Sequence, residues 1–283
     1  MKKIKIVGVP EHFNYPWHLC FERNEFVHAE IDLEWTDVPE GTGKMCQMLR
    51  NGEADIAVIL TEGIVKDIEA GSPSKIVQVY VESPLIWGIH VSANSSYQEL
   101  SELENKKVAI SRIGSGSQLM AYVNASNEDW DSKNLKFEIV NTIDGAVEAL
   151  TNGTADYFMW ERFMTKPLVD KGIFRRIADC PTPWPCFVIA VRDEILGNDP
   201  QAVKTILEII NRQTKTFRTI PGIANVLAEK FHQKPDDIVQ WLSMTEWSQE
   251  SPLPDMLNKV QNQLLELSLI DKKSTFAEVV KAL

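Results

Sequence analysis

The sequence has few of the features that mark secreted scaffolds, zinc proteins or membrane proteins. Only four of its 283 residues are cysteines, and no two of them form a CxxC pair. A disulfide-stabilised scaffold is therefore excluded, and the sequence argues against a zinc ribbon. No apolar run approaches the roughly 18 residues that cross a bilayer. We expect reduced, partly buried thiols, no metal site and no insertion into a membrane; whether Cys180 and Cys186 pair stays open.

A secretory leader is also missing from the sequence. Met1, Lys2 and Lys3 give a positive start, but the apolar run stops at Val9. Neither a long apolar region nor a small-residue cleavage site follows, and a secretory leader needs both. Residues 4–9 predict a buried first strand instead. We expect a cytoplasmic protein; the alternative is a periplasmic or lipid-anchored protein whose leader has been removed.

Positive charge is scarce relative to negative charge. Lys and Arg number 29 and Asp and Glu number 40, so the formal net charge is −11. This balance argues against non-specific binding to nucleic acids or anionic membranes. It does not exclude a small anionic ligand, because one local site can differ in sign from the whole surface.

An internal repeat organises the chain. The segment LRNGEAD at 49–55 matches LTNGTAD at 150–156, with five of seven positions identical and an offset of 101 residues. Each copy predicts a helix that stops at Asn-Gly, where the left-handed cap conformation is favoured. An apolar strand follows each copy. The length and the repeat together predict two related α/β lobes.

Strand and helix patterns alternate through both halves, which is typical of parallel sheets covered on both faces. The expected strands are 4–9, 30–36, 55–60 and 75–81 in the first half, and 107–111, 135–140, 155–159 and 174–178 in the second. The expected helices are 16–27, 42–51 and 63–70, then 115–126, 143–151 and 163–171.

The last hundred residues predict one strand and a helical tail. The strand is 187–191, and the helices are 199–218, 221–231, 235–243, 253–268 and 275–282. We expect this tail to pack on the first lobe. The fold class is therefore α/β: two Rossmann-like lobes joined by a two-strand hinge, with a C-terminal helical tail on lobe 1. Lobe 1 would comprise 1–87 and 185–283, and lobe 2 would comprise 88–184.

Ligands of open α/β sheets bind beyond the carboxyl ends of the strands. The residues just after each predicted strand and at the hinge are therefore the candidates for one interlobe site. They are His12, Phe13, Asn14, Gly41, Thr42, Gly43, Thr61, Glu62, Trp87, Arg112, Gly114, Ser115, Gly116, Ser117, Trp160, Glu161 and Trp184.

Two glycine-rich loops among these candidates predict an anion site. Residues 41–43 (GTG) and 114–117 (GSGS) each open a predicted helix, where free backbone N–H groups and the positive helix end favour a negative group. The alternative is that both loops are ordinary helix caps. Trp87, Trp160 and Trp184 suit a flat or organic ligand, although each could simply be a core residue.

The two glutamates in matching loops, Glu62 and Glu161, predict a place for an amine-bearing group; the alternative is solvated or capping carboxylates. Catalytic signatures are absent. No Walker A loop, GxGxxG, HExxH or GxSxG motif occurs, and His12 is the only histidine in a candidate loop. We therefore predict no catalytic residue, no cofactor and no metal.

Six motifs together resemble one family of binding proteins. They are VPEHF (9–13), GTG (41–43), NGEADIA (51–57), LTEG (60–63), SRIGSGS (111–117) and FMWE (158–161). The chain resembles type II periplasmic-binding-protein-like solute-binding proteins, in the branch of nitrate, sulfonate, taurine and thiamine-pyrimidine-precursor binders. Within that branch it looks most like a leaderless subgroup of gut bacteria and yeasts.

The resemblance implies a solute-binding protein that closes two lobes on a small organic anion or a heteroaromatic ligand. A sulfonate, a carboxylate or a thiamine-pyrimidine precursor would fit. The alternative is a cytoplasmic enzyme of thiamine-pyrimidine or related cofactor metabolism on the same fold, for which His12 or Lys44 would be the reactive group. A permease of an ABC transporter is an expected partner only if the protein is exported.

Overall fold

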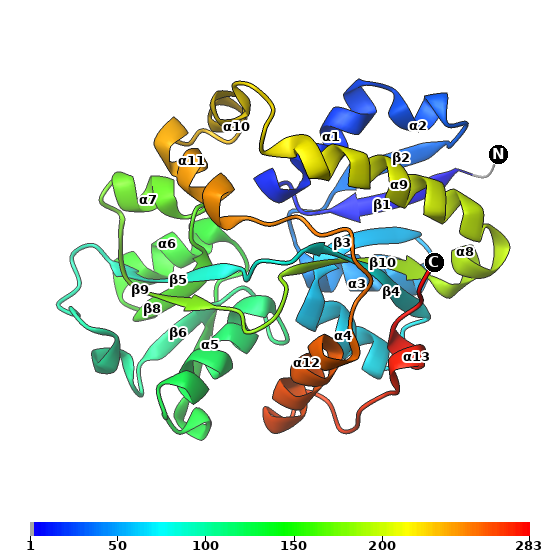
Figure 1. Cartoon of the computed structure of the whole chain (residues 1–283). Helices are drawn as coiled ribbons and strands as arrows, with labels where there is room; N and C mark the ends of the chain where they lie inside the picture. Colours follow the sequence, from blue (N-terminus) through cyan, green and yellow to red (C-terminus); the bar gives the residue numbers. More distant parts are fainter. Residues whose placement is uncertain (1–2) are drawn as a thin grey trace. The chain divides into compact units, whose positions relative to one another are not determined.

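The computed structural model describes residues 3–283 (Figure 1); Met1 and Lys2 of the positively charged start lie outside the described residues. The chain divides into two compact units. Unit 1 comprises Met1–Ser83 and Trp184–Leu283, and unit 2 comprises Pro84–Pro183. The sequence places these boundaries after Trp87 and Trp184. Two mixed α/β sheets with flanking helices confirm the predicted fold class.

The sheet of unit 1 has five strands in the order β2-β1-β3-β10-β4. Their bounds are β1 Ile4–Gly8, β2 Leu33–Asp37, β3 Ile56–Leu60, β4 Ser74–Val81 and β10 Phe187–Arg192. β1 runs parallel to β2 and β3, whereas β10 runs antiparallel to both β3 and β4. The predicted parallel arrangement therefore holds for β1 to β4, and the added strand β10, for which the sequence indicated no direction, runs against its two neighbours. A buried strand is a run of apolar residues whichever way it runs, so its hydrophobic pattern does not indicate whether it is parallel or antiparallel to its neighbours.

Unit 2 repeats this topology in the order β7-β6-β8-β5-β9. The bounds are β5 Ile86–Ser92, β6 Lys107–Ile110, β7 Lys136–Ile139, β8 Tyr157–Glu161 and β9 Phe174–Pro181. Here β5 is the antiparallel member, between β8 and β9. The sequence predicted no strand between residues 81 and 107, and the structure corrects this. Its run from Trp87 to Val91 is buried, because both faces of a central strand are covered.

The sequence repeat performs the same structural task in both units. Helices α3 (Thr42–Asn51) and α6 (Ile143–Asn152) end at Gly52 and Gly153, with φ of 71° and 78°. The repeated aspartates then tie the next strand to the first strand of each sheet. Asp55 Oδ2 accepts the N–H of Lys5 at 3.0 Å, and Asp156 Oδ2 accepts that of Lys107 at 2.8 Å.

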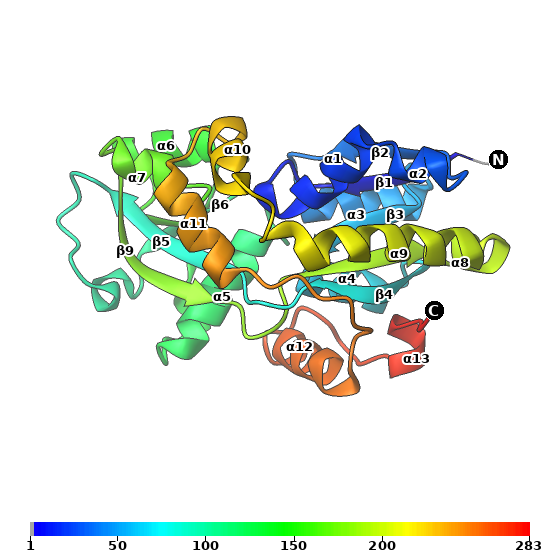
Figure 2. The same cartoon turned by 45° about the horizontal axis from the view of Figure 1, so that its top comes forward.

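Helices flank each sheet. Those of unit 1 are α1 Tyr15–Glu22, α2 Glu25–His28, α3, α4 Thr61–Glu69, α8 Asp193–Asn198, α9 Pro200–Phe217, α10 Ile223–Lys230, α11 Pro235–Met244, α12 Pro254–Glu266 and α13 Phe276–Val279; unit 2 has α5 Gly116–Asn127, α6 and α7 Lys166–Asp170. The tail packs on unit 1, as predicted: α9 on α1, α12 on α4 and α13 on β4 (Figure 2). Isolated bridges also join Ile76 to Val280 and Val81 to Trp247.

Gly145 in α6 tests how tightly unit 2 packs. A Cβ at this position would lie 2.0 Å from the Val140 carbonyl oxygen, whereas a Cβ on the helical Gly197 would meet nothing within 4 Å. We expect Gly145→Ala to lower the free energy of unfolding by about 1–3 kcal/mol. Gly197→Ala is the matched control and should be neutral or stabilising by about 0.5–1 kcal/mol. Denaturant titration measures both; equal effects would contradict the packing described.

Candidate functional site

The start of α5 in unit 2 carries a cluster of buried hydroxyl groups. Ser117 Oγ accepts the N–H of Ser111 at 3.0 Å and lies 3.0 Å from Ser115 Oγ. Ser115 caps the helix by accepting the N–H of Gln118 at 3.3 Å. The N–H of Gly114 donates to Gln118 Oε1 at 2.6 Å. The predicted GSGS loop is therefore a genuine helix cap whose hydroxyls are fixed by one another.

This cap also concentrates hydrogen-bond donors. The first amides of an α-helix have no partner within the helix, and the helix dipole adds partial positive charge. At 12 residues, α5 is long enough for both effects. Gly116 and Ser117 are the first helical residues, while Arg112 is partly exposed and Gly114 is exposed beside them. The geometry fits an acceptor group at this end.

Trp87 lies at the same edge of the sheet. β6 and β8 run parallel, so their carboxyl ends lie at the same edge of the sheet. Trp87 pairs with Glu161, the last residue of β8, and therefore lies at this edge too. The Trp87 ring meets the partly exposed Trp160 edge-on, with centroids 6.3 Å apart. Trp87 is 4% exposed, and its Nε1–H has no partner. An indole nitrogen can only donate, so this donor also calls for an acceptor.

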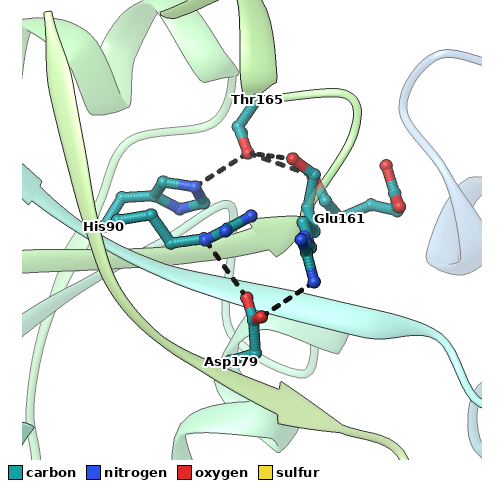
Figure 3. Close-up of polar contacts among 6 residues, drawn as sticks. His90, Glu161, Thr165 and Asp179 are labelled. Atoms are coloured by element: carbon teal, nitrogen blue, oxygen red, sulfur yellow. Dashed lines mark hydrogen bonds and ion pairs between the residues drawn. The ribbon is translucent and has the colours of Figure 1, made fainter. Parts of the chain in front are cut away.

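Glu161 is held by its own loop. Its Oε2 accepts the N–H of Met164 at 2.6 Å, and its backbone carbonyl accepts the hydroxyl of Thr165 at 3.1 Å (Figure 3). That hydroxyl also lies 2.9 Å from His90 Nε2. Burial lowers the pKa of His90 to about 4, so the ring is neutral near pH 7. The direction of the hydrogen bond between Thr165 and His90 depends on which ring nitrogen of His90 carries the proton.

An ion-pair cluster braces the neighbouring strand. Asp179 on β9 meets Arg162 at 3.1 Å through Oδ2 and Arg176 at 3.4 Å through Oδ1 (Figure 3). All three groups are partly shielded from solvent. The cluster links the residue after β8 to β9, and so supports the edge that carries Glu161.

In unit 1, the loop after β1 is a short 3-10 helix, His12–Asn14, buried in aromatic side chains. His12 is fully buried, and its ring centroid lies 4.1 Å from that of Trp241 and 5.5 Å from that of Phe231. Neither ring nitrogen of His12 has a hydrogen-bond partner. Burial lowers the pKa of His12 to about 3, so this histidine is a weak base.

Phe13 and Asn14 hold that loop in place. The Phe13 carbonyl accepts the Tyr80 hydroxyl at 2.9 Å and the Trp247 indole N–H at 3.2 Å. Asn14 Nδ2 donates to the Val9 carbonyl at 2.8 Å, which orients its amide and leaves Oδ1 buried without a donor.

Thr61 and Glu62 begin α4 directly after β3 and contact the segment that precedes β10. Thr61 Oγ donates to the Pro185 carbonyl at 2.5 Å. The Trp184 indole donates to Glu62 Oε2 at 2.8 Å. Glu62 is 1% exposed, and its other oxygen, Oε1, has no partner. Burial raises the pKa of Glu62 to about 7, opposed by bonds from the α4 backbone and Trp184.

The GTG loop lacks a comparable hydroxyl cluster. Gly41, with φ of 75°, caps α3 without a side-chain bond, and Gly43 is exposed. The methyl group of Thr42 packs where a Cβ on Gly63 would lie, 2.1 Å away. The structure therefore favours the capping interpretation for this loop, in contrast to the hydroxyl-rich start of α5.

The structure thus gathers the candidates into two sets, one in each unit. His12, Phe13, Asn14, Gly41, Thr42, Gly43, Thr61, Glu62 and Trp184 belong to unit 1, and Trp87, Arg112, Gly114, Ser115, Gly116, Ser117, Trp160 and Glu161 belong to unit 2. Sequence reasoning missed the supporting contacts of His90, Thr165 and Gln118. Gln118 follows the GSGS motif directly, which was the available signal; the other two had none.

Two further findings concern residues 3–283. No three histidine, cysteine, aspartate or glutamate side chains among them gather in a way that could hold a metal ion. None of the helices in this range combines the length and the apolar character needed to cross a membrane.

Residues 87–180 match the sequence model of the family described as Ca3427-like PBP. Over the whole chain, the structure is similar to the CA3427 gene product of Candida albicans, which defines a family exhibiting the generic periplasmic-binding-protein fold. The TM-score is 0.90 at 22% identity, over 99% of this chain and 96% of that one. This chain has the periplasmic-binding-protein-like fold.

Two other structures with this fold are named for the binding of an alkanesulfonate and of nitrate. The alkanesulfonate-binding protein SsuA of Xanthomonas axonopodis pv. citri, solved with MOPS, has a TM-score of 0.84 at 14% identity, covering 99% of this chain and 98% of that one. The periplasmic nitrate-binding protein NrtA of Synechocystis PCC 6803 has a TM-score of 0.75 at 14% identity, covering 98% of this chain and 84% of that one. No curated protein matches the chain in sequence. The resemblance predicted from the motifs is confirmed at the level of the fold.

The buried state of His12 predicts an acid sensitivity. Its pKa is about 3 in the folded protein and about 6.5 when unfolded. The unfolded state therefore binds more protons below pH 6.5, and stability falls as the pH drops from there toward 3. The free energy of unfolding of the wild type should fall between pH 7 and pH 4, and we expect His12→Phe to make this fall smaller by about 2–3 kcal/mol.

Denaturant titration at several pH values measures this effect. His28→Gln, at an exposed position, is the control and should leave the pH profile unchanged. An unchanged profile in His12→Phe as well would show that the His12 ring is accessible to protons.

Proposed function

We propose that this solute-binding fold binds a small organic anion, a sulfonate or a carboxylate, and that unit 2 holds the anionic group. The observation that carries the proposal is the unpartnered Nε1–H of Trp87. It lies at the same sheet edge as the start of α5, so two independent kinds of donor occur there.

The energetics favour an anionic ligand at this edge. A buried donor without a partner costs about 1–3 kcal/mol, and a bond to a charged acceptor contributes more than one to a neutral acceptor. Sulfonate and carboxylate groups present several acceptor oxygens, which match an indole N–H and helix amides together. The partly exposed ring of Trp160 adds an apolar surface, which suits an organic anion better than an inorganic one.

The relatives support the same ligand class. SsuA proteins of Escherichia coli and Xanthomonas axonopodis are named for sulfonate binding, and NrtA for nitrate. At these identities the likeness carries the fold alone, so the choice of ligand rests on the donors of unit 2. The expected closure on the ligand and the cytoplasmic location stay predictions. An ABC-type permease partner is proposed only for an exported form.

The enzyme alternative gains no support from its two candidate residues. His12, with a pKa of about 3, is too weak a base for acid–base work near neutral pH. Lys44 Nζ lies 3.7 Å from Glu53 Oε2 at the surface. An absorbance band of a Schiff base after addition of pyridoxal phosphate would nevertheless favour a thiamine-pyrimidine enzyme over a binding protein.

Replacing Trp87 tests the proposal directly. Trp87→Phe keeps an aromatic ring and removes the N–H, so we expect affinity for butane-1-sulfonate to fall about 10- to 100-fold. Isothermal titration calorimetry measures the change. The matched control is Trp130→Phe, in the same unit but beyond the far end of α5, which should bind as wild type does. Binding that Trp87→Phe leaves intact would place the anion elsewhere.

A further inference from the structure

The internal repeat places an Asn-Gly pair at the end of a helix in each unit. The pairs are Asn51-Gly52 after α3 and Asn152-Gly153 after α6. Asparagine before glycine is prone to lose its side-chain amide, because a glycine leaves the following backbone nitrogen sterically accessible. The sequence alone predicts equal reactivity for the two pairs. The structure distinguishes them by the backbone bonds of the cap, the partner of the asparagine side chain and the cover over the glycine.

The cap of α3 is closed by three backbone hydrogen bonds. Gly52 N–H donates to the Leu49 carbonyl at 3.2 Å. The N–H groups of Glu53 and Ala54 both donate to the Met48 carbonyl, at 2.9 and 3.1 Å. The nitrogen of Gly52 is therefore held in the helix cap, and Asn51 cannot turn toward it without breaking a bond.

The cap of α6 is looser at the equivalent positions. Within the described part of the chain, no backbone group accepts the N–H of Gly153. Of the three N–H groups that follow α6, only that of Ala155 donates back into the helix, to the Ala149 carbonyl at 3.2 Å. The last turn of a helix frays readily. Asn152 can therefore change its backbone angles without breaking a bond of Gly153.

The two asparagine side chains are bound through opposite atoms. Thr154 N–H donates to Asn152 Oδ1 at 2.9 Å, and a donor at this place stabilises the negative charge that develops on Oδ1 when Cγ is attacked. In the first copy, Asn51 Nδ2 donates to Glu53 Oε1 at 2.9 Å. That bond ties the nitrogen that must leave to a carboxylate. The contact of Asn152 favours attack, whereas the contact of Asn51 opposes it.

Solvent access differs in the same direction. Asn152, Gly153 and Thr154 are all exposed, and a Cβ on Gly153 would meet nothing within 4 Å. Gly52 is only partly exposed, because the guanidinium group of Arg192 covers it: a Cβ on Gly52 would lie 3.2 Å from Arg192 Nη1. Water therefore reaches the second pair more freely than the first.

We propose that Asn152 is a site of spontaneous deamidation by water and that Asn51 is protected from it. The Gly153 nitrogen attacks Asn152 Cγ. The new N–Cγ bond forms, the Cγ–Nδ2 bond breaks, and ammonia leaves with the proton that the Gly153 nitrogen gives up. Water then adds to either carbonyl carbon of the succinimide and breaks its bond to that nitrogen, which leaves aspartate or isoaspartate at position 152.

The modification changes the charge at the end of α6. Both products carry a negative charge where Asn152 has none, at the C-terminus of a helix, where the helix dipole disfavours it. Isoaspartate also inserts the side-chain methylene into the backbone between α6 and β8. The same helix packs Ala146, Ala149 and Leu150 into the core of unit 2.

Peptide mapping by mass spectrometry tests this on the full-length protein, aged in mildly alkaline buffer, because conversion of an amide to an acid changes the mass of the peptide. We expect the folded chain to deamidate about 10-fold faster at Asn152 than at Asn51. The chain unfolded in urea is the matched control. It should deamidate at similar rates at both sites, since glycine follows each asparagine.

Asn152→Gln identifies the reacting residue, because the longer side chain would have to close a larger ring and does so more slowly. The variant should lose the mass change in the peptide that contains position 152 and keep the slow reaction at Asn51. Equal rates at the two asparagines of the folded chain would overturn the proposal. So would an unreactive Asn152 in the folded chain under conditions in which the unfolded chain deamidates.

Discussion

One antiparallel strand within each sheet, flanked by two strands that run the other way, determines which residues lie at the edge that carries the candidate site. β10 runs against β3 and β4, and β5 runs against β8 and β9. An antiparallel strand begins where its parallel neighbours end. The residues that lead into β10 and β5 are therefore delivered to the carboxyl edges. Trp184 reaches Glu62 in this way, and Trp87 comes to lie opposite Glu161.

The two units share this sheet topology but differ in the side chains that follow the strands. The repeated aspartates, Asp55 and Asp156, make the same bond to the first strand of each sheet. Beyond the strands the chemistry diverges. The start of α5 has a network of serine hydroxyls, whereas the start of α3 has a glycine cap without a side-chain bond. A duplicated scaffold thus supplies donors on one unit and acceptors on the other.

Because helix stops and apolar strands are set by neighbouring residues, local patterns in the sequence were sufficient for the repeat, the candidate loops and most of the elements, although not for β5. They were insufficient for the direction of β5 and β10, which depends on pairing with strands distant in the chain. The surroundings of His12 show the same limit. The aromatic rings of Phe231 and Trp241, which pack against His12, belong to the C-terminal tail. The sequence around His12 therefore could not reveal that this histidine, predicted to contact a ligand, is enclosed by them.

The bonds within the site are similarly long-range. Trp184 and Glu62 are 122 residues apart, and Thr165 and His90 are 75 apart. Both glutamates could be found by their place after a strand, yet only the tertiary structure shows that Glu161 Oε2 is satisfied by Met164 and that Glu62 Oε1 is not. Residue type and position predict a candidate, while hydrogen-bond satisfaction decides its role.

The unpartnered groups near these edges also bear on stability. Each costs about 1–3 kcal/mol when buried, a substantial share of the 5–15 kcal/mol by which folded domains are typically stable. Trp87 Nε1 and Glu62 Oε1 are such groups; Trp87 lies near the start of β5, and Glu62 follows β3 at the start of α4. A ligand group that satisfies one of these atoms recovers that cost only in the folded state. Ligand affinity and fold stability are therefore linked through the same atoms, and the chain's net charge of −11 is no obstacle to binding an anion where the local donors are concentrated.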